Sequence, residues 1–108
     1  MKINTHEHIG VDLVDSELKV VSKYDQNFRN IYDHLARKTY QNSEYPFLST
    51  IDPYSYTLYN ALQVPLLVEE LQKLASEDED TELKAAVEKL VEYLETVSVH
   101  CFIRFIGD

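Results

Sequence analysis

Two amphipathic stretches joined by a short acidic segment constrain this chain more than any other feature. Residues 64–76 and 81–96 both repeat apolar side chains at the spacing of one helix face, with charged side chains on the remaining positions. Only residues 77–80 separate the two stretches, which predicts an antiparallel helical hairpin. The apolar positions are Leu67, Leu71 and Leu74 in the first stretch and Leu83, Ala86, Val87, Leu90, Val91 and Leu94 in the second.

The starts of these two helices carry their own signals. Pro65 falls in the first turn, where a helix does not use the backbone N–H that proline lacks. Asp80 or Thr81 offers a side-chain oxygen that can cap the second helix. Because proline breaks a helix interior, we interpret residues 57–62 as a separate short helical turn that ends before Pro65.

Residues 97–106 predict a C-terminal strand, because β-branched and aromatic residues alternate along them. Apolar side chains occupy much of both faces of this strand. Such a pattern is typical of an internal strand covered on both sides, or of an edge strand that pairs with another chain.

The first half of the chain is less regular. Residues 26–39 predict a helix capped by Asp25, because apolar side chains recur along one face. Residues 9–21 fit either one or two strands or a short helix. Residues 47–51 fit either a short strand or a buried loop.

Together these elements predict an α+β fold in a single domain over residues 1–108. Three or more helices, including the hairpin of 64–76 and 81–96, are expected to pack on a small sheet that includes the strand at 97–106. Two glycines and three prolines leave no flexible linker, and no internal repeat is present. A chain of this length can bury a core without disulfides or a metal.

The net charge of −9 limits the class of partner. Residues 1–54 carry eight acids and six bases, a balance of −2, whereas residues 55–108 carry eleven acids and four bases, a balance of −7. Nucleic acids and anionic membrane surfaces require basic side chains, so we expect neither as a partner. The charge favours a basic protein partner, or serves solubility alone.

The sequence also indicates where the protein works. No run of 18 apolar residues is present, and the first residues have neither an apolar core nor a cleavage site typical of a signal peptide. The one cysteine, Cys101, cannot form a disulfide within the chain. We therefore expect a cytoplasmic protein.

Histidine and cysteine are the side chains best suited to chemistry here. His6 and His8 flank Glu7 and could hold zinc, but no further ligands follow at a recognised spacing. His100 and Cys101 would point to opposite faces of a strand, so the imidazole is poorly placed to activate the thiol. Phosphate loops, nucleophile elbows and zinc-protease motifs are missing from the sequence. We expect no catalytic residue, no metal and no cofactor.

Two groups of side chains are candidates for contact with a protein partner. Tyrosines are dense between residues 40 and 59, and tyrosine is common at interfaces because its ring is apolar and its hydroxyl stays wet. The same property suits half-buried packing. The acids of residues 77–80 are the second group, although acids before a helix also stabilise its dipole. The candidates are Tyr54, Tyr56, Tyr59, Glu77, Asp78, Glu79 and Asp80.

Two sequence features support a resemblance. Residues 52–67 have the form DPYxxTxxNxLQxPxL, and the chain ends in FIGD. In these features it resembles small uncharacterised bacterial proteins of similar length. In size and acidity it also resembles bacterial immunity proteins, a class that binds and neutralises a toxin, often a basic nuclease. Immunity proteins have many unrelated folds, so this resemblance implies a protein-binding function and assigns no residue.

Three functions follow in order of preference. The first is a non-enzymatic protein-binding domain of the immunity type, which would contact a basic toxin through the tyrosines and acids named above. The second is a self-associating structural module, a homodimer in which the strand at 97–106 pairs with its twin. The third is a small enzyme that uses His34 or His100 with a carboxylate.

Overall fold

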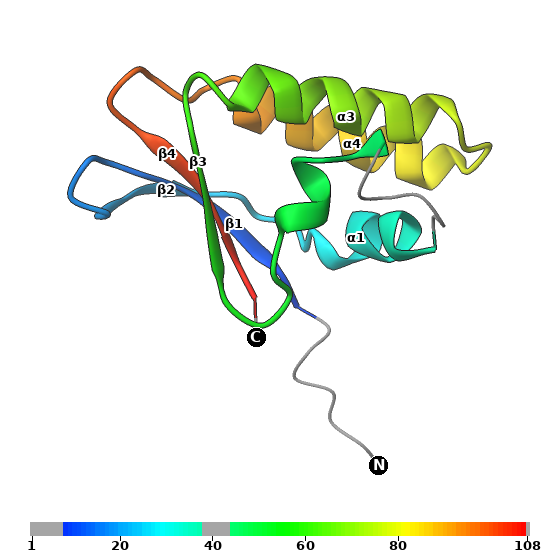
Figure 1. Ribbon diagram of the computed structural model, residues 1–108, viewed down its shortest axis with the longest axis horizontal. Coiled ribbons are helices and arrows are strands. Elements are labelled where there is room, and N and C mark those ends of the chain that lie inside the picture. The colour runs from blue at the N-terminus through cyan, green and yellow to red at the C-terminus, as the bar shows by residue number, and fades with distance from the viewer. Residues whose placement is uncertain (1–7, 38–43, 108) are drawn as a thin grey trace, which may run out of the picture.

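The computed structural model describes residues 8–37 and 44–107, which form a layer of helices packed on one face of an antiparallel sheet (Figure 1). The four strands lie in the order β2-β1-β4-β3. The predicted α+β class is therefore confirmed. The elements are β1 (Gly10–Val14), β2 (Val20–Lys23), α1 (Arg29–Ala36), the short 3₁₀ helix η2 (Leu48–Thr50), β3 (Tyr56–Asn60), α3 (Val64–Ser76), α4 (Thr81–Leu94) and β4 (Phe102–Ile106).

The helical hairpin is confirmed: α3 has the predicted bounds, whereas α4 ends at Leu94, two residues before the predicted end at 96. Pro65 lies in the first turn of α3, as expected. Asp80 caps α4, with its Oδ1 accepting from Glu82 N at 2.9 Å and Leu83 N at 3.3 Å. Lys84 in α4 donates from Nζ to Ala75 O at 2.9 Å, which satisfies a carbonyl of the last turn of α3. The two helices are thus joined at their turn by polar contacts as well as by packing.

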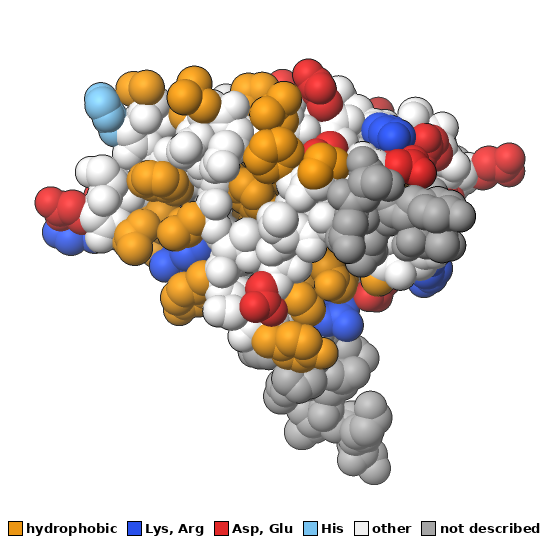
Figure 2. Space-filling view, in the orientation of Figure 1, with side chains coloured by type: hydrophobic (Ala, Val, Ile, Leu, Met, Phe, Trp, Pro, Cys, Tyr) orange, Lys and Arg blue, Asp and Glu red, His pale blue; other side chains and the backbone are white. Residues whose placement is uncertain are grey.

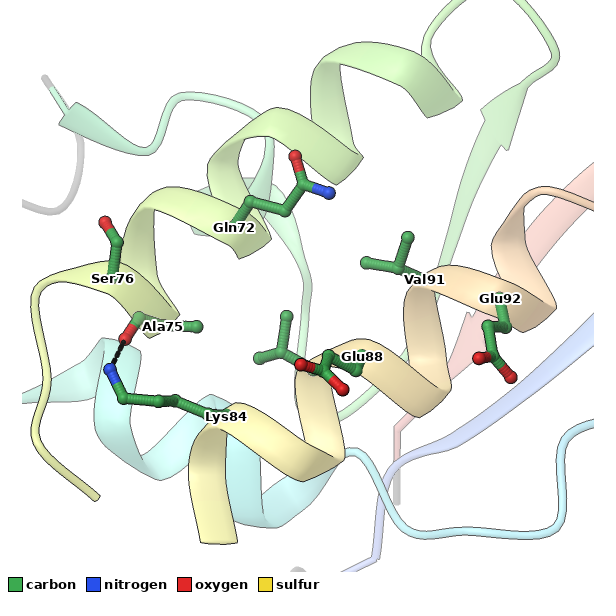
Figure 3. Close-up of a pocket in the computed structure, with 8 residues that line it drawn as sticks. Gln72, Ala75, Ser76, Lys84, Glu88, Val91 and Glu92 are labelled. Carbon is green, nitrogen blue, oxygen red and sulfur yellow. Dashed lines mark hydrogen bonds between the residues drawn. The ribbon is translucent and has the colours of Figure 1, made fainter. Parts of the chain in front are cut away.

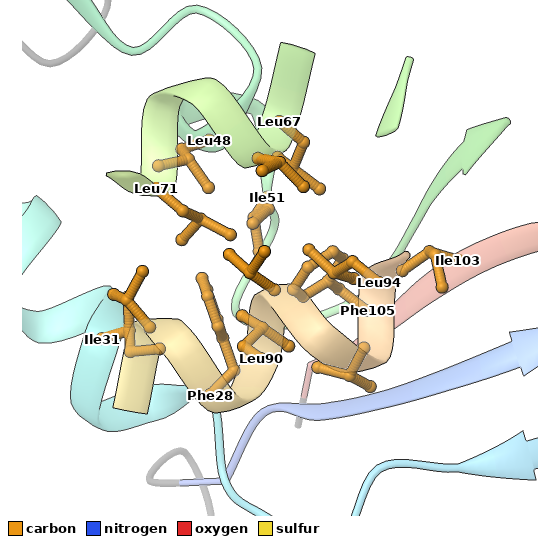
Figure 4. Close-up of a cluster of buried hydrophobic side chains, with 14 of the residues drawn as sticks. Phe28, Ile31, Leu48, Ile51, Leu67, Leu71, Leu90, Leu94, Ile103 and Phe105 are labelled. Atoms are coloured by element: carbon orange, nitrogen blue, oxygen red, sulfur yellow. The ribbon is translucent and has the colours of Figure 1, made fainter. Parts of the chain in front are cut away.

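The core lies between the sheet and the three α-helices (Figure 4). Every second residue of the central strands points into it, as the period of a strand requires. Phe28 and Phe105 meet edge to face in its centre, with ring centroids 4.9 Å apart. Buried side chains labelled in Figure 4 are Phe28, Ile31, Leu48, Ile51, Leu67, Leu71, Leu90, Leu94, Ile103 and Phe105.

The C-terminal strand is shorter than predicted and is internal. Residues 97–101 form turns, with Val97 N bonded to Leu94 O and Cys101 N to Ser98 O. β4 then pairs with β1 on one side and β3 on the other. The internal position of the strand is confirmed and the edge-strand alternative is wrong, but the described helices cover only one face of β4 instead of the expected two.

Residues 57–62 do not form the predicted helical turn. They belong largely to β3, which pairs with β4 from Tyr56 opposite Ile106 to Asn60 opposite Phe102. The sequence of residues 57–62 was misleading because its tyrosine, threonine and leucine side chains fit the spacing of a helix as well as that of a strand. Long-range pairing with β4 decides the conformation.

The predicted Asp25 cap is also wrong. Helix α1 starts after Phe28, and no side chain caps it in the manner expected. Asn27 fills part of that role, because its Oδ1 accepts from Arg29 N and from Ile9 N, both at 2.9 Å. The amide oxygen therefore ties the start of α1 to the strand layer. The last two residues of the predicted helix, 38 and 39, lie outside the described residues.

The structure decides between the alternatives that the sequence left open for residues 9–21 and 47–51. Residues 9–21 hold β1 and the start of β2 rather than a helix, joined by a turn in which Asp15 Oδ1 accepts from Glu17 N and Lys19 N. Residues 47–51 contain η2 instead of a strand. Among the described residues, no helix is long and apolar enough to cross a membrane.

Candidate functional site

The helices leave the other face of the sheet uncovered in the described part of the chain (Figure 1). We call this surface the open sheet face. Its side chains come from alternate strand residues, and many are apolar where a solvated face would normally be polar. The most exposed large apolar residues on or beside it are Val20, Val21, Tyr54, Tyr56 and Leu58. Half-buried Phe102 and Ile106 lie between them on β4.

One ion pair occupies the centre of the open sheet face. Arg104 of β4 lies opposite Asp12 of β1. It donates from Nε to Asp12 Oδ1 at 3.1 Å and from Nη2 to Oδ2 at 2.9 Å. This hydrogen bonding raises the pKa of Arg104, against the smaller opposing effect of burial. The Asp12 side chain is only 2% exposed, so its charge is met by arginine rather than by water.

Tyr56 covers this ion pair from β3. Its ring lies 5.0 Å from the Arg104 guanidinium carbon, a cation–π contact. The Tyr56 residue is nevertheless 64% exposed. An aromatic ring stacked on arginine is therefore offered to solvent on the β3 side of the open sheet face.

A shallow pocket of about 290 Å³ lies beside the ion pair. Lys23, Tyr24 and Arg104 line one part of it, and Gly10 and Ile106 another. His8 also lines the pocket and is exposed. The pocket gives the open sheet face a concave region where Lys23 and the Asp12–Arg104 ion pair lie beside apolar side chains.

The three candidate tyrosines do not lie together. Tyr54 and Tyr56 are exposed, whereas Tyr59 is 2% exposed and points into the core. The Tyr59 hydroxyl donates to Phe47 O at 2.7 Å and lies 2.8 Å from Thr50 Oγ1. Burial raises the pKa of Tyr59 to about 12. Tyr59 therefore stabilises the η2 segment and is not available to a partner in this conformation.

The four candidate acids lie at the far end of the helical layer, away from the start of β3 (Figure 1). Glu77 accepts a 2.6 Å hydrogen bond from the Tyr45 hydroxyl. Asp80 caps α4, as described above, and Asp78 Oδ1 accepts from Asp80 N at 2.9 Å. Glu79 is exposed. Most of these acids therefore have roles within the fold, and they do not share a surface with Tyr54 and Tyr56.

His34 is the histidine that lies closest to carboxylates. Its Nδ1 is 3.3 Å from Asp78 Oδ2, and its Nε2 is 3.3 Å from Asp80 Oδ2. A cleft of about 550 Å³ adjoins it, lined in part by Arg37 and Glu82. Each ring nitrogen therefore has a carboxylate oxygen within 3.3 Å, so both nitrogens are engaged within the fold. This geometry suits a clamp between α1 and the α3–α4 turn.

The other candidate groups for chemistry are not assembled. His100 is exposed, and the half-buried Cys101 has its Sγ 3.2 Å from the Ser98 hydroxyl. His6 and Glu7 of the possible zinc site lie outside the described residues. Within residues 8–37 and 44–107, no group of three or more His, Cys, Asp or Glu side chains could hold a metal ion.

A third concave region lies between α3 and α4 (Figure 3). Its volume is about 520 Å³, and we call its apolar lining residues Ala75, Val87 and Val91 its floor. Glu88 and Glu92 project from the α4 side in Figure 3. The floor residues are already buried against the core. These floor residues are therefore far less exposed than Tyr56 and Leu58 on the open sheet face.

Sequence reasoning missed Asp12, Arg104, Val20 and Leu58. Asp12 and Arg104 could have been found, because each is a single charged residue inside an otherwise apolar strand. Such a charge needs a partner when it is buried. Val20 and Leu58 gave no signal, because apolar strand residues are ordinarily assigned to the core.

Comparison of the chain with protein-family models, with curated proteins and with solved structures found no match in any of the three.

Proposed function

We propose that this protein is a non-enzymatic protein-binding domain that docks a partner on the open sheet face. The observation that carries the proposal is the set of exposed apolar and aromatic side chains there, above all Tyr56 and Leu58 on β3 and Val20 and Val21 on β2. Figure 2 shows hydrophobic side chains gathered over the strands, on the side where β3 crosses in front. Contiguous apolar surface of this kind is typical of interaction sites.

The residue types around the Asp12–Arg104 ion pair on the open sheet face support binding of a protein. Tyrosine and arginine are the residues that most often dominate binding energy at interfaces. Tyr56 is held on Arg104, and Arg104 is held by Asp12, so both anchors are ordered before a partner arrives. A partner would therefore lose less conformational entropy in ordering them. The Asp12–Arg104 pair is already neutralised, which lowers the cost of covering it.

A narrower form of the proposal is an immunity-type inhibitor that neutralises a basic toxin in the cytoplasm. The support for it is the charge of −9. Much of that charge lies on exposed glutamates of the helical layer: Glu69, Glu82, Glu88, Glu92 and Glu95. Such a field would speed encounter with a basic protein, while the open sheet face would supply the contact.

Capture from the native cell extract at low and high salt tests this proposal. Three tagged proteins are compared: the wild type, the double variant Tyr56→Ala/Val20→Ser, and the control Glu79→Ala. We expect the wild type and the control to retain the same basic protein, and the double variant to lose it. Capture by the double variant together with loss by Glu79→Ala would reassign the contact to the acidic turn. If the wild type retains no protein, the proposal fails.

A further inference from the structure

We propose that the free edge of β3 pairs in antiparallel fashion with β3 of a second copy of this chain. The two sheets would then join into one continuous sheet across a two-fold axis. This inference concerns the strand edge and does not depend on the partner proposed for the open sheet face.

The backbone of β3 has hydrogen-bonding groups directed away from the sheet. Gly107 N donates to Ser55 O across the β3–β4 ladder, so the odd-numbered residues of β3 face β4. Alternation then turns the N–H and C=O groups of Tyr56 and Leu58 outward. In agreement, Asn60 N points to the outside, where it donates to Gln63 Oε1 at 2.9 Å. Within the described residues, no further strand pairs with Tyr56 or Leu58.

The two edges of the sheet differ in how they are protected. β2 carries the charged Lys23 at its end, and its pairing with β1 is broken by an irregularity between Leu13 and Val14. Lysines and bulges are devices that block edge pairing. β3 has neither, since its sequence is YTLYN and its register with β4 is regular. β3 is therefore the edge suited to accept another strand.

Charge argues for an identical partner at this edge. Two chains of −9 repel one another, so a surface without net charge is where a second copy associates at low electrostatic cost. β3 contains no charged side chain. The charges nearest to it on the open sheet face, Asp12 and Arg104, cancel each other. The exposed acid Asp52 lies beside Thr57, with its backbone N donating to Thr57 Oγ1, but β3 itself brings no charge to a pairing with a second β3.

The outward backbone N–H and C=O groups of Tyr56 and Leu58 also suit pairing of two copies about a two-fold axis. In an antiparallel pair centred on Thr57, Tyr56 of each chain lies opposite Leu58 of the other. Each such pair exchanges both of its outward backbone hydrogen bonds. The Asn60 N–H, which Gln63 already uses, is not needed in this register. Tyr56 and Leu58 lie on the same face, so an aromatic ring would pack on a leucine at both ends of the axis.

Sedimentation equilibrium of the purified chain over a concentration series tests the proposal. The wild type should approach a dimer mass as concentration rises. Leu58→Glu should weaken association at least about tenfold, because it places a carboxylate between two acidic chains. Ala85→Glu adds the same charge at an exposed position of α4, outside the sheet, and should leave association nearly unchanged. Raising the salt concentration should tighten the dimer, because it screens the repulsion between the two chains.

A second measurement applies if Leu58→Glu fails to fold. Amide hydrogen exchange of the wild type at high and low concentration should show protection of Tyr56 and Leu58 that is lost on dilution. A wild type that stays monomeric at every concentration overturns the proposal. So does a dimer that Leu58→Glu leaves intact, or one that both glutamate variants weaken equally. Because purified chain alone is used, failure here leaves the protein-binding proposal standing, and failure of the capture experiment leaves this one standing.

Discussion

Arg104 holds the buried carboxylate of Asp12 through two hydrogen bonds of 3.1 and 2.9 Å, across the centre of a sheet face that no described helix covers. Removing the arginine would leave a carboxylate that is 2% exposed without its partner. We therefore expect Arg104→Met to lower the free energy of unfolding by about 3 kcal/mol, measured by urea denaturation at pH 7.

Two further variants distinguish loss of the Asp12–Arg104 ion pair from a general loss of stability on substitution. Replacing both partners, as in Asp12→Leu with Arg104→Met, should recover much of the loss, because apolar side chains can replace a buried pair. Lys19→Ala removes an ion pair with Glu17 in which both side chains are largely exposed, and should change stability by less than about 0.5 kcal/mol. Equal losses for Arg104→Met and Lys19→Ala would contradict this account of the pair.

Glu70 is a buried acid whose role is to hold the η2 segment. It is 9% exposed, and its carboxylate accepts from Phe47 N at 3.0 Å and from Leu48 N at 2.9 Å. Glu70→Ala should cost about 1–3 kcal/mol, because two backbone donors lose their acceptor. Glu70→Gln keeps one acceptor oxygen and should cost less. Amide exchange of Phe47 and Leu48 should accelerate in the alanine variant before that of α4, and unchanged exchange would argue against the capping role.

Asp80 stabilises the fold mainly as the cap of α4. Asp80→Ala should lower the unfolding free energy by about 1 kcal/mol, the usual effect of losing an N-cap. Asp80→Asn retains a capping oxygen and should lose less. A double-mutant cycle with His34→Ala measures the separate contact to the imidazole. If Asp80→Asn and Asp80→Ala are equally destabilised, the cap is not the main contribution.

Alkaline pH should destabilise the protein through its buried tyrosines. Burial raises the pKa of Tyr59 to about 12, and burial together with the bond to Glu77 raises the pKa of Tyr45. The unfolded chain releases these protons near pH 10, before the folded chain does, so stability is present below pH 10 and falls as pH rises towards 12. Urea midpoints at pH 8, 10 and 11 should show this decline, with a shallower slope in Tyr59→Phe. A slope unchanged by that substitution would contradict the assignment.

The helical hairpin could be predicted because its information is local. Three local signals indicate the same two helices: the helical spacing of the leucines, Pro65 in the first turn of α3 and Asp80 as the cap of α4. Each signal depends only on residues close to it in the sequence. β3 could not be predicted in this way. Its tyrosines and threonine favour a strand, but residues 57–62 also have helical spacing, and the choice depends on β4, which follows more than 40 residues later.

Only the local part of the candidate site could be predicted from the sequence. Tyrosine density pointed to residues 54–59, and Tyr54 and Tyr56 are indeed exposed. The sequence does not distinguish them from Tyr59, because the face on which each lies is fixed by the register with β4. The acids of residues 77–80 gave a strong charge signal, yet their contacts with Tyr45 and His34 require the tertiary fold.

Site-specific photo-crosslinking in the native cell tests the central claim most directly. A photoreactive phenylalanine analogue replaces Tyr56 on the open sheet face in one strain, and exposed Ala85 on α4 in another. The account predicts an adduct with another protein from position 56, distinguishable by mass from a second copy of this chain, and none from position 85. An adduct from position 85 with none from position 56 would contradict the claim that the open sheet face is the docking surface.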